Sequence, residues 1–206
     1  MRSNEREKHW DTVYSARAEN EVSWFQAKPA TSFDLISKSG VAKDARIIDV
    51  GGGASRLVDF LLEEGFSDIT VLDVAAAALD RAKARLGSRA SAVNWIVADL
   101  TQWKPSGRYK LWHDRAVFHF LVEAKDRDAY RQVLRAAIEP GGFAIISTFA
   151  PDGPERCSGL PVMRYSGESL VGELGSDFRL LETVSEDHRT PAGATQRFQF
   201  SRLQRR

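Results

Sequence analysis

The sequence has few of the features that mark several large classes of protein. Its 206 residues include a single cysteine, Cys157, which excludes an internal disulfide and a cysteine-based zinc site. No stretch approaches the ~18 consecutive apolar residues of a membrane span. Met1 to Trp10 is charged and lacks the apolar segment of a secretory signal. We therefore expect a cytoplasmic protein that has no membrane partner.

A surplus of one charge is also absent. The chain carries 29 Lys and Arg against 28 Asp and Glu, a net charge of +1. Proteins that bind nucleic acid usually carry a basic surplus, so we expect no nucleic-acid partner. The length corresponds to one domain or slightly more, which is enough to bury a core without disulfides or metals.

Apolar runs alternate with segments of helical periodicity from residue 46 onward. The runs are continuously apolar, which is typical of a parallel sheet covered on both faces and so indicates a doubly wound α/β fold. The expected strands are residues 46–50, 69–73, 93–99, 109–114 and 143–149, and the expected helices follow Ser55, Ala75 and Asp126. Pro140-Gly141-Gly142 is expected to form a turn before the fifth strand.

The two ends of the chain depart from this alternation. After a short helix at 168–174, residues 178–184 and 197–203 are expected to form a hairpin whose last strand is antiparallel. Residues 1–45 are too few for a separate domain. We interpret them as a helical leader, with helices at 4–17 and after a cap at Thr31 or Ser32, that folds as a lid over residues 46–206. The chain is thus expected to be a single domain.

The first strand ends in a glycine-rich loop, Asp49-Val50-Gly51-Gly52-Gly53-Ala54-Ser55. Ligands of open parallel sheets bind beyond the carboxyl ends of the strands, and glycines let the backbone approach a ligand closely. The G-x-G-x-x-G dinucleotide fingerprint requires a third glycine where this chain has Arg56, which counts against NAD. The loop therefore indicates a ligand site of another kind.

Three acidic residues stand at the ends of three strands. Asp49 closes the first and suits a cationic ligand, while Asp73 follows Gly51 by 22 residues, where a carboxylate can accept both hydroxyls of a ribose. Asp99 ends the third strand, near the expected place of an adenine. One such acid is often a helix cap, but three at one edge of a sheet favour a ligand site.

With these motifs the sequence resembles the class I S-adenosylmethionine-dependent methyltransferases. Ile48 to Gly53 is similar to the D-x-G-x-G motif of that family, and Asp99-Leu100 and Pro140-Gly141-Gly142 match two later motifs. The resemblance implies a Rossmann-like, seven-stranded, mainly parallel sheet with an antiparallel last strand, S-adenosylmethionine as cofactor, and no metal. The residues it implies in cofactor binding are Asp49, Gly51, Gly52, Gly53, Ser55, Arg56, Asp73, Val74, Asp99, Leu100 and Asp114.

A narrower resemblance concerns the acceptor. Trp112 to Ala116 and Asp126 to Tyr130 are similar to the fourth-strand region of thiopurine and related thiol S-methyltransferases, as are Trp10-Asp11 and Trp24-Phe25-Gln26 in the leader. It implies that the acceptor atom is a thiol sulfur.

The candidate catalytic residues are Asp114, Arg115 and His119, near the end of the fourth strand. A neutral histidine can take a proton from an amine or thiol, although His119 can equally pack in the core. The aromatic residues of the leader are open to two readings, a lid over the ligand or ordinary core packing; they are Trp10, Tyr14, Trp24 and Phe25. Cys157 falls in a loop that can line a substrate pocket.

Four functions are consistent with these patterns. The leading one is methyl transfer from S-adenosylmethionine to a heteroatom of a small molecule by in-line displacement. The alternatives are protein-lysine N-methylation, an NAD-dependent oxidoreductase, and a binding protein for an adenosine-containing ligand without turnover.

Overall fold

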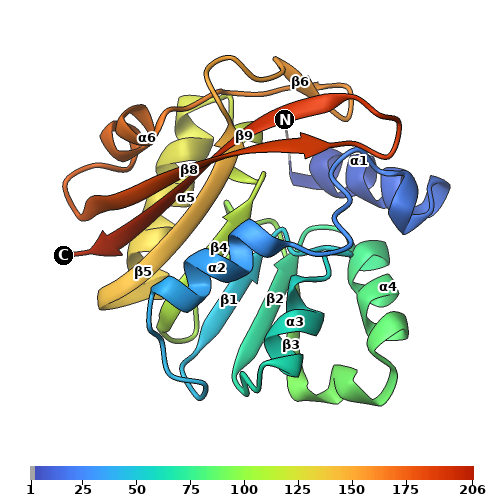
Figure 1. Ribbon diagram of the computed structural model, residues 1–206, viewed down its shortest axis with the longest axis horizontal. Helices are drawn as coiled ribbons and strands as arrows, with labels where there is room; N and C mark the ends of the chain where they lie inside the picture. The colour runs from blue at the N-terminus through green and yellow to red at the C-terminus, as the bar shows by residue number, and fades with distance from the viewer. Residues whose placement is uncertain (1–2) are drawn as a thin grey trace.

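The computed structural model describes residues 3–206, in which seven strands form one sheet with helices on both faces (Figure 1). The strand order is β3-β2-β1-β4-β5-β9-β8. Neighbours among β1 to β5 run parallel, and β9 is antiparallel to both β5 and β8. The strands are β1 (Ile47–Val50), β2 (Ile69–Asp73), β3 (Val93–Val97), β4 (Tyr109–Arg115), β5 (Ile138–Phe149), β8 (Phe178–Arg189) and β9 (Thr195–Arg205).

Helices of two groups cover the two faces of the sheet. Side chains of successive strand residues point to opposite faces, so Ile47 packs in the cluster of α2, α3 and α4, whereas Ile48 packs in the cluster of α5 and α6. This double burial explains why β1 and β2 are apolar along their whole length. The helices are α1 (Ser3–Ala16), α2 (Ala30–Lys38), α3 (Leu57–Glu63), α4 (Ala76–Leu86), α5 (Ala124–Ala137) and α6 (Gly167–Leu174), with 3-10 turns η1 (Glu19–Glu21), η2 (Gly87–Ala92) and η3 (Phe118–Phe120).

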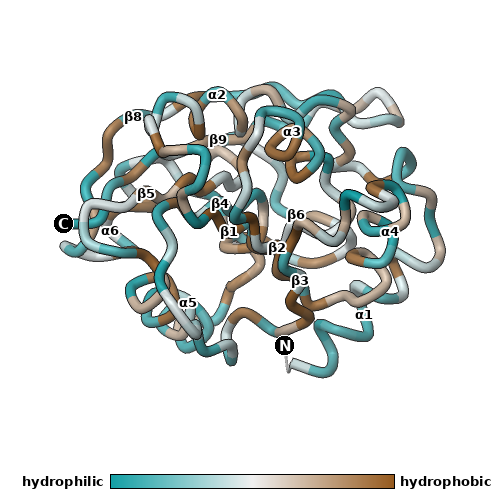
Figure 2. Tube along the Cα trace, turned by 90° about the horizontal axis from the view of Figure 1, so that it is seen from below, coloured by the Kyte–Doolittle hydropathy of each residue, from teal (hydrophilic) through white to brown (hydrophobic). Residues whose placement is uncertain are grey.

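The hydropathy of the trace follows this layering. Figure 2 shows the central strands largely hydrophobic and α1 largely hydrophilic. Tyr14 is the buried residue of α1, which lies beside α4 near the ligand end of the sheet. Within residues 3–206, no helix combines the length and the apolar character needed to cross a bilayer.

The seven-stranded order and the antiparallel last strand confirm the expected fold class. The expected turn at Pro140-Gly141-Gly142 is wrong, because these residues lie inside β5. Gly141 has φ +74° there, and the pairing of β5 with β4 shifts register near this point. The irregularity lets the strand continue to Ile138 where the sequence indicates a break.

Two further local expectations differ from the structure. Neither Thr31 nor Ser32 caps α2, which begins at Ala30 directly after Pro29. Ser32 is instead buried and bonded to a histidine of β4. The loop after β5 contains an unexpected small hairpin, β6 (Arg156–Cys157) with β7 (Leu160–Pro161).

Candidate functional site

A cavity of 140 Å³ lies at the carboxyl ends of β1 to β4, below α1 and the aromatic residues of the leader. Its lining comes from α1, the glycine loop, the ends of β2, β3 and β4, the β6–β7 hairpin and β9. The lining residues are Arg6, Trp10, Tyr14, Trp24, Gly51, Leu72, Asp73, Val74, Ala98, Asp99, Leu100, Thr101, Arg115, Ala116, Val117, Phe120, Leu121, Cys157, Leu160 and Phe198. The convergence of parallel strand ends brings the sequence-predicted acids Asp73 and Asp99 to one cavity.

The glycine loop forms one wall, where side chains would not fit. Gly51 and Gly53 have φ of +63° and +47°, a region that glycine enters at little cost. A Cβ on Gly51 would stand 2.0 Å from Val117 Cγ2. One on Gly53 would stand 2.8 Å from Tyr14 Oη and 3.1 Å from Asp73 Oδ2. The loop thus presents bare backbone to the space in front of Asp73.

Asp73 ends β2 and is buried at the cavity. The Ala75 backbone N–H donates to its Oδ1 at 2.8 Å, while Oδ2 faces Gly53. Burial, with a smaller contribution from the Asp49 charge, raises the pKa of Asp73 to about 7. A ligand that donates hydroxyl hydrogens to this carboxylate would stabilise its ionised form, which fits the ribose implied by the sequence.

Asp99 lies after β3 and is held by several donors. Arg6 Nη1 donates to its Oδ2 at 3.0 Å, and the Thr101 N–H and Oγ1 donate to its Oδ1 at 2.9 and 2.8 Å. Burial alone would raise the pKa of Asp99, but hydrogen bonds from Thr101 and Ser3 and the charge of Arg6 outweigh it and lower the pKa. Asp99 therefore stays an acceptor, with Val74 and Leu100 as apolar cavity wall beside it.

A second cavity of 50 Å³ adjoins the glycine loop on the side of Asp49. His113 Nδ1 lies 2.7 Å from Asp49 Oδ1, and His113 Nε2 lies 2.9 Å from Ser32 Oγ. All three residues are buried. The hydrogen-bonded series Ser32–His113–Asp49 fixes Oδ1 of Asp49. Oδ2 of Asp49 lies beside Gly52, where it can bind a cationic group.

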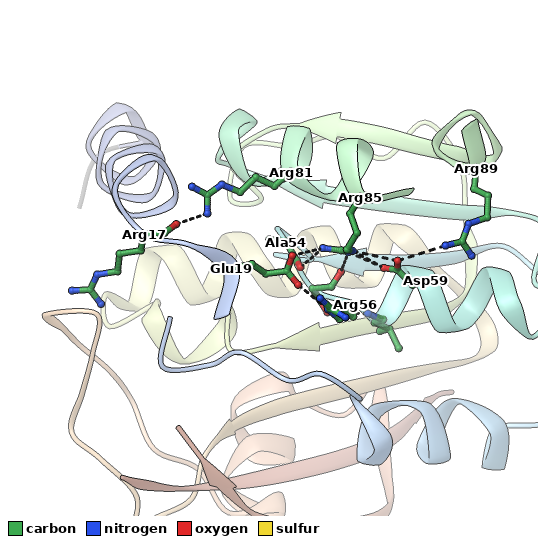
Figure 3. A network of polar contacts seen from close by, with 10 residues as sticks. Arg17, Glu19, Ala54, Arg56, Asp59, Arg81, Arg85 and Arg89 are labelled. Atoms are coloured by element: carbon green, nitrogen blue, oxygen red, sulfur yellow. Dashed lines mark hydrogen bonds and ion pairs between the residues drawn. The ribbon is translucent and has the colours of Figure 1, made fainter. Parts of the chain in front are cut away.

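Arg56, which precedes α3, and Arg85 of α4 tie the leader to the glycine loop (Figure 3). Arg85 Nη1 donates to Glu19 at 3.0 Å and to the Ala54 carbonyl at 2.9 Å, and Arg56 Nε donates to Glu19 at 2.9 Å. Ser55 Oγ accepts from the Leu57 N–H at 3.1 Å. Ser55, Arg56 and Gly52 line the smaller cavity, so these sequence-predicted residues lie at the site, although Ser55 and Arg56 also form bonds within the chain.

Asp114 lies outside both cavity linings. Its buried carboxylate accepts from Tyr130 Oη at 2.7 Å and from the N–H groups of Val117 and Phe118 at 2.8 and 3.2 Å. Burial raises the pKa of Asp114 to about 6. These bonds hold the turn after β4, where Ala116 has φ +74°. The structure thus gives Asp114 a positioning role for the turn and places no cavity surface on it.

Arg115 is the sequence-predicted catalytic candidate that borders both cavities. Its Nη1 donates to the Trp24 carbonyl at 2.9 Å, and its guanidinium carbon lies 4.9 Å from the Phe198 ring centroid. Nε and Nη2 are buried and have no hydrogen-bond partner. Burial lowers the pKa of Arg115 to about 10, so the group is cationic at neutral pH.

His119 is fully buried in η3, away from both linings. Its Nδ1 accepts from the Phe149 N–H at 3.4 Å, and its ring centroid lies 4.4 Å from Phe120 and 4.9 Å from Phe149. Burial, and then the charge of Arg115, lowers the pKa of His119 to about 3. The ring is therefore neutral and packed in the core, which matches the second reading made from the sequence.

Several lining residues have no counterpart among the residues predicted from sequence motifs, notably Arg6, Phe120 and Phe198. The sequence could have indicated Arg6 as a lining residue, because Arg6, Trp10 and Tyr14 are spaced four residues apart and so share one face of α1. The ring centroid of Trp10 lies 5.7 Å from that of Trp24 and 5.1 Å from that of Phe120. The aromatic residues are thus both cavity wall and packed cluster.

Cys157 also lines the larger cavity, as a buried free thiol. Burial raises its pKa to about 11 and keeps it protonated. Among residues 3–206 there is no group of three or more His, Cys, Asp or Glu side chains suited to a metal ion.

Comparison with known proteins finds a family match that begins at β1 and ends within β5. Residues 47–142 match the sequence family described as "Methyltransferase domain". The eEF1A lysine and N-terminal methyltransferase of Mus musculus is 22% identical over 136 residues, which make up 65% of this chain and 19% of that protein. The chain therefore spans about a fifth of the length of this relative.

Two solved structures share the whole fold. An S-adenosylmethionine-dependent methyltransferase from Anabaena variabilis superposes with a TM-score of 0.77 at 15% identity, covering 99% of this chain and 95% of that chain. The 1,6-didemethyltoxoflavin-N1-methyltransferase of Burkholderia thailandensis, solved with 1,6-didemethyltoxoflavin and S-adenosylhomocysteine bound, gives 0.68 at 18% identity, with coverages of 98% and 84%. Residues 47–142 thus match the methyltransferase domain family, and the whole chain has the fold of solved S-adenosylmethionine-dependent methyltransferases.

Proposed function

We propose that this protein transfers the methyl group of S-adenosylmethionine to a heteroatom of a small molecule. One observation carries the proposal. Asp73, Asp99 and the bare backbone of Gly51 line the same cavity as the apolar side chains of Phe120, Leu160 and Phe198. Polar groups suited to a cofactor and an apolar surface suited to an acceptor therefore meet in one cavity.

Different residues of the chain are proposed to bind different parts of the cofactor. Asp73 would accept hydrogen bonds from the ribose hydroxyls, Asp99 would hold the adenine, and Asp49 would bind the ammonium of the methionine part. When bound, the cofactor supplies a methyl group on a positively charged sulfur, so neither a metal nor a covalent nucleophile is needed. The protein has to orient the two reactants and exclude water, which is the contribution of α1 and its aromatic residues.

The acceptor atom provides the electron pair for the new bond to the methyl carbon. The bound cofactor would release its methyl group with the electrons of the carbon–sulfur bond remaining on sulfur, and any proton on the acceptor atom would pass to solvent. His119 is neutral, but it is buried away from the cavity, so it is not part of our proposal as a base.

Two observations favour a small acceptor over a protein lysine. Side chains of α1 and the ring of Trp24 line the cavity, so that a small acceptor can be surrounded by protein there. The Burkholderia thailandensis neighbour has a small bound substrate, although the mouse relative is named for lysine and N-terminal methylation. A thiol remains the acceptor implied by the narrower resemblance, and a cytoplasmic location remains a prediction.

The test has a binding step and a turnover step. Thermal-shift measurements with S-adenosylmethionine, S-adenosylhomocysteine and NAD should show stabilisation by the first two alone. Asp73→Asn should weaken S-adenosylhomocysteine binding by roughly tenfold or more, as expected for the loss of a charged acceptor. Asp80→Asn, on the exposed side of α4, serves as the matched control.

Labelled S-adenosylmethionine is then incubated with a panel of thiols, amines and phenols and with whole lysate. Label in small molecules supports the proposal. Label confined to a protein band would contradict a small-molecule acceptor and indicate protein methylation. Stabilisation by NAD alone would refute the use of S-adenosylmethionine as cofactor.

A further inference from the structure

Arg115 lines the cavity, and its guanidinium carries an unused hydrogen-bonding edge. Its Nη1 is occupied by the Trp24 carbonyl, whereas Nε and Nη2 are buried without a partner. These two nitrogens form one edge of the planar guanidinium, with parallel N–H bonds that match the two oxygens of a carboxylate. The free edge of Arg115 is therefore suited to bind a carboxylate through two hydrogen bonds.

No carboxylate among the described residues 3–206 fills this edge. Within residues 3–206, Arg115 forms no ion pair, although Glu186 and Asp49 are near enough to influence its charge. Glu186 accepts from Gln26 Nε2 at 2.7 Å, and Asp49 is engaged by His113. A buried cation without an anionic partner destabilises the folded protein, unless a bound ligand supplies the anion.

The other arginine at this cavity is already paired. Arg6 binds Asp99 and also Asp126, so its charge is balanced inside the protein. Of the cavity-lining residues in the described chain, Arg115 is thus the cation available to a ligand.

The surroundings of Arg115 indicate the rest of the ligand. Phe198 lies under the guanidinium, and Trp24, Phe120 and Leu160 add apolar wall. The nearby Cys157 thiol is protonated at neutral pH and adds no competing negative charge. An aromatic or other apolar body with one carboxylate would be complementary to this end of the cavity.

We propose that Arg115 binds a carboxylate of the methyl acceptor through Nε and Nη2, so that the substrate is a small acid with an apolar body. This inference rests on the proposed methyltransferase function and specifies its substrate class. Arg115 contacts the substrate away from the reacting atom and determines specificity.

A carboxylate is also present on the methionine part of the cofactor, and Arg115 borders the smaller cavity as well. The first arm of the experiment separates these sources. S-adenosylhomocysteine carries the carboxylate and 5′-methylthioadenosine lacks it, so calorimetry with both ligands is compared for the wild type, Arg115→Gln and Arg115→Lys. We expect both affinities to change less than threefold. A loss of tenfold or more for S-adenosylhomocysteine alone would assign Arg115 to the cofactor and overturn the proposal.

The second arm tests the acceptor directly. Aromatic thiols, amines and phenols with and without a carboxyl group, such as thiosalicylate and thiophenol, are added to the wild-type complex with S-adenosylhomocysteine and followed by thermal shift, and kcat/KM is measured for those that react. The acids should bind or react roughly 10- to 100-fold better than their neutral analogues. Arg115→Gln should abolish this preference, and Arg115→Lys should retain part of it.

Equal treatment of acids and neutral analogues by the wild type, or a preference that survives in Arg115→Gln, would overturn the proposal. Absence of binding by every acid in the panel would do the same. A different result would refute the proposed methyltransferase function itself: the wild-type protein would not bind S-adenosylhomocysteine. Arg179→Gln, on the exposed part of β8, is the matched control, and urea unfolding verifies that each variant folds.

Discussion

Gly51 shows how one residue shapes the site. Its backbone has φ +63°, and the position of a Cβ is already occupied by Val117 from the turn after β4. The glycine is therefore required by packing within the chain as well as by the approach of a ligand. Asp114 contributes indirectly, since its carboxylate holds the Val117 N–H that fixes this turn.

Replacement of Gly51 by alanine should lower the free energy of unfolding by about 2–5 kcal/mol, from positive φ together with overpacking against Val117. Gly65→Ala is the matched control, because Gly65 has φ +84° and open space around its Cβ position. Gly65→Ala should lower the free energy of unfolding by about 1–2 kcal/mol, from the positive φ alone. Urea unfolding measures both, and the double variant Gly51→Ala/Val117→Ala should recover part of the loss. Equal costs for the two single variants would contradict this explanation.

If Asp73 binds the cofactor ribose as proposed, it should make cofactor binding sensitive to pH. Its pKa of about 7 means that the carboxyl group is largely protonated at pH 6 and largely ionised at pH 8. A protonated carboxyl loses acceptor capacity for two ribose hydroxyls, so affinity should fall as pH falls. We expect the Kd for S-adenosylhomocysteine to rise roughly tenfold between pH 8 and pH 6, following the ionised fraction. Calorimetry at both pH values tests this, and Asp73→Asn should bind weakly with little pH dependence.

At the scale of an element, α1 forms a lid through one face. Arg6, Trp10 and Tyr14 lie on successive turns and contact the cavity, whereas the opposite face of α1 is exposed and polar. Arg6 joins this helix to Asp99 after β3 and to Asp126 in α5. A cofactor that enters beside Asp99 has to share or displace these contacts, so the stability of α1 on the sheet and ligand entry are linked.

Arg6→Gln should loosen α1 because two carboxylates lose their charged partner. We expect faster amide hydrogen exchange across Ser3–Ala16 and a loss of about 1–3 kcal/mol in the free energy of unfolding. Arg17→Gln is the matched control, since Arg17 contributes its backbone carbonyl to Arg81 and its side chain points away from the network in Figure 3. Unchanged exchange in Arg6→Gln would show that the aromatic residues hold the lid without the ion pairs.

At the scale of the whole molecule, the leader is integrated with the sheet. Leu35 and Ile36 of α2 share a core cluster with β1, β4 and β9, and Ser32 reaches His113 of β4 through a buried hydrogen bond. Glu19 connects the leader to α4 through Arg85. These contacts favour one cooperative unit, in keeping with the proposed single domain.

We expect urea unfolding to show one transition, with the same midpoint by tryptophan fluorescence and by far-ultraviolet circular dichroism. The fluorescence includes Trp10 and Trp24 of the leader together with tryptophans of the sheet. Addition of S-adenosylhomocysteine at 100 times its Kd should stabilise the whole unit by about 2.7 kcal/mol. Separate midpoints for the two signals would instead define the leader as an independently unfolding part.

The sequence by itself determined the fold class and which strand-end residues meet at one cavity. Continuous apolar strands specify a parallel sheet, and its carboxyl ends necessarily bring the loop at Gly51 together with Asp73 and Asp99. These are consequences of local periodicity and of chain direction, so they can be deduced without coordinates.

The tertiary structure alone decided which side chains face the cavity beyond those strand ends. Asp114 and Arg115 are the last two residues of β4, and His119 follows in η3, yet only Arg115 reaches the cavity while the other two are buried in the core. Phe198 arrives under Arg115 from β9, and Arg6 reaches Asp99 across 93 positions of sequence. Such contacts depend on how distant elements pack and on which buried polar groups find partners, and neither leaves a periodic signal in the chain.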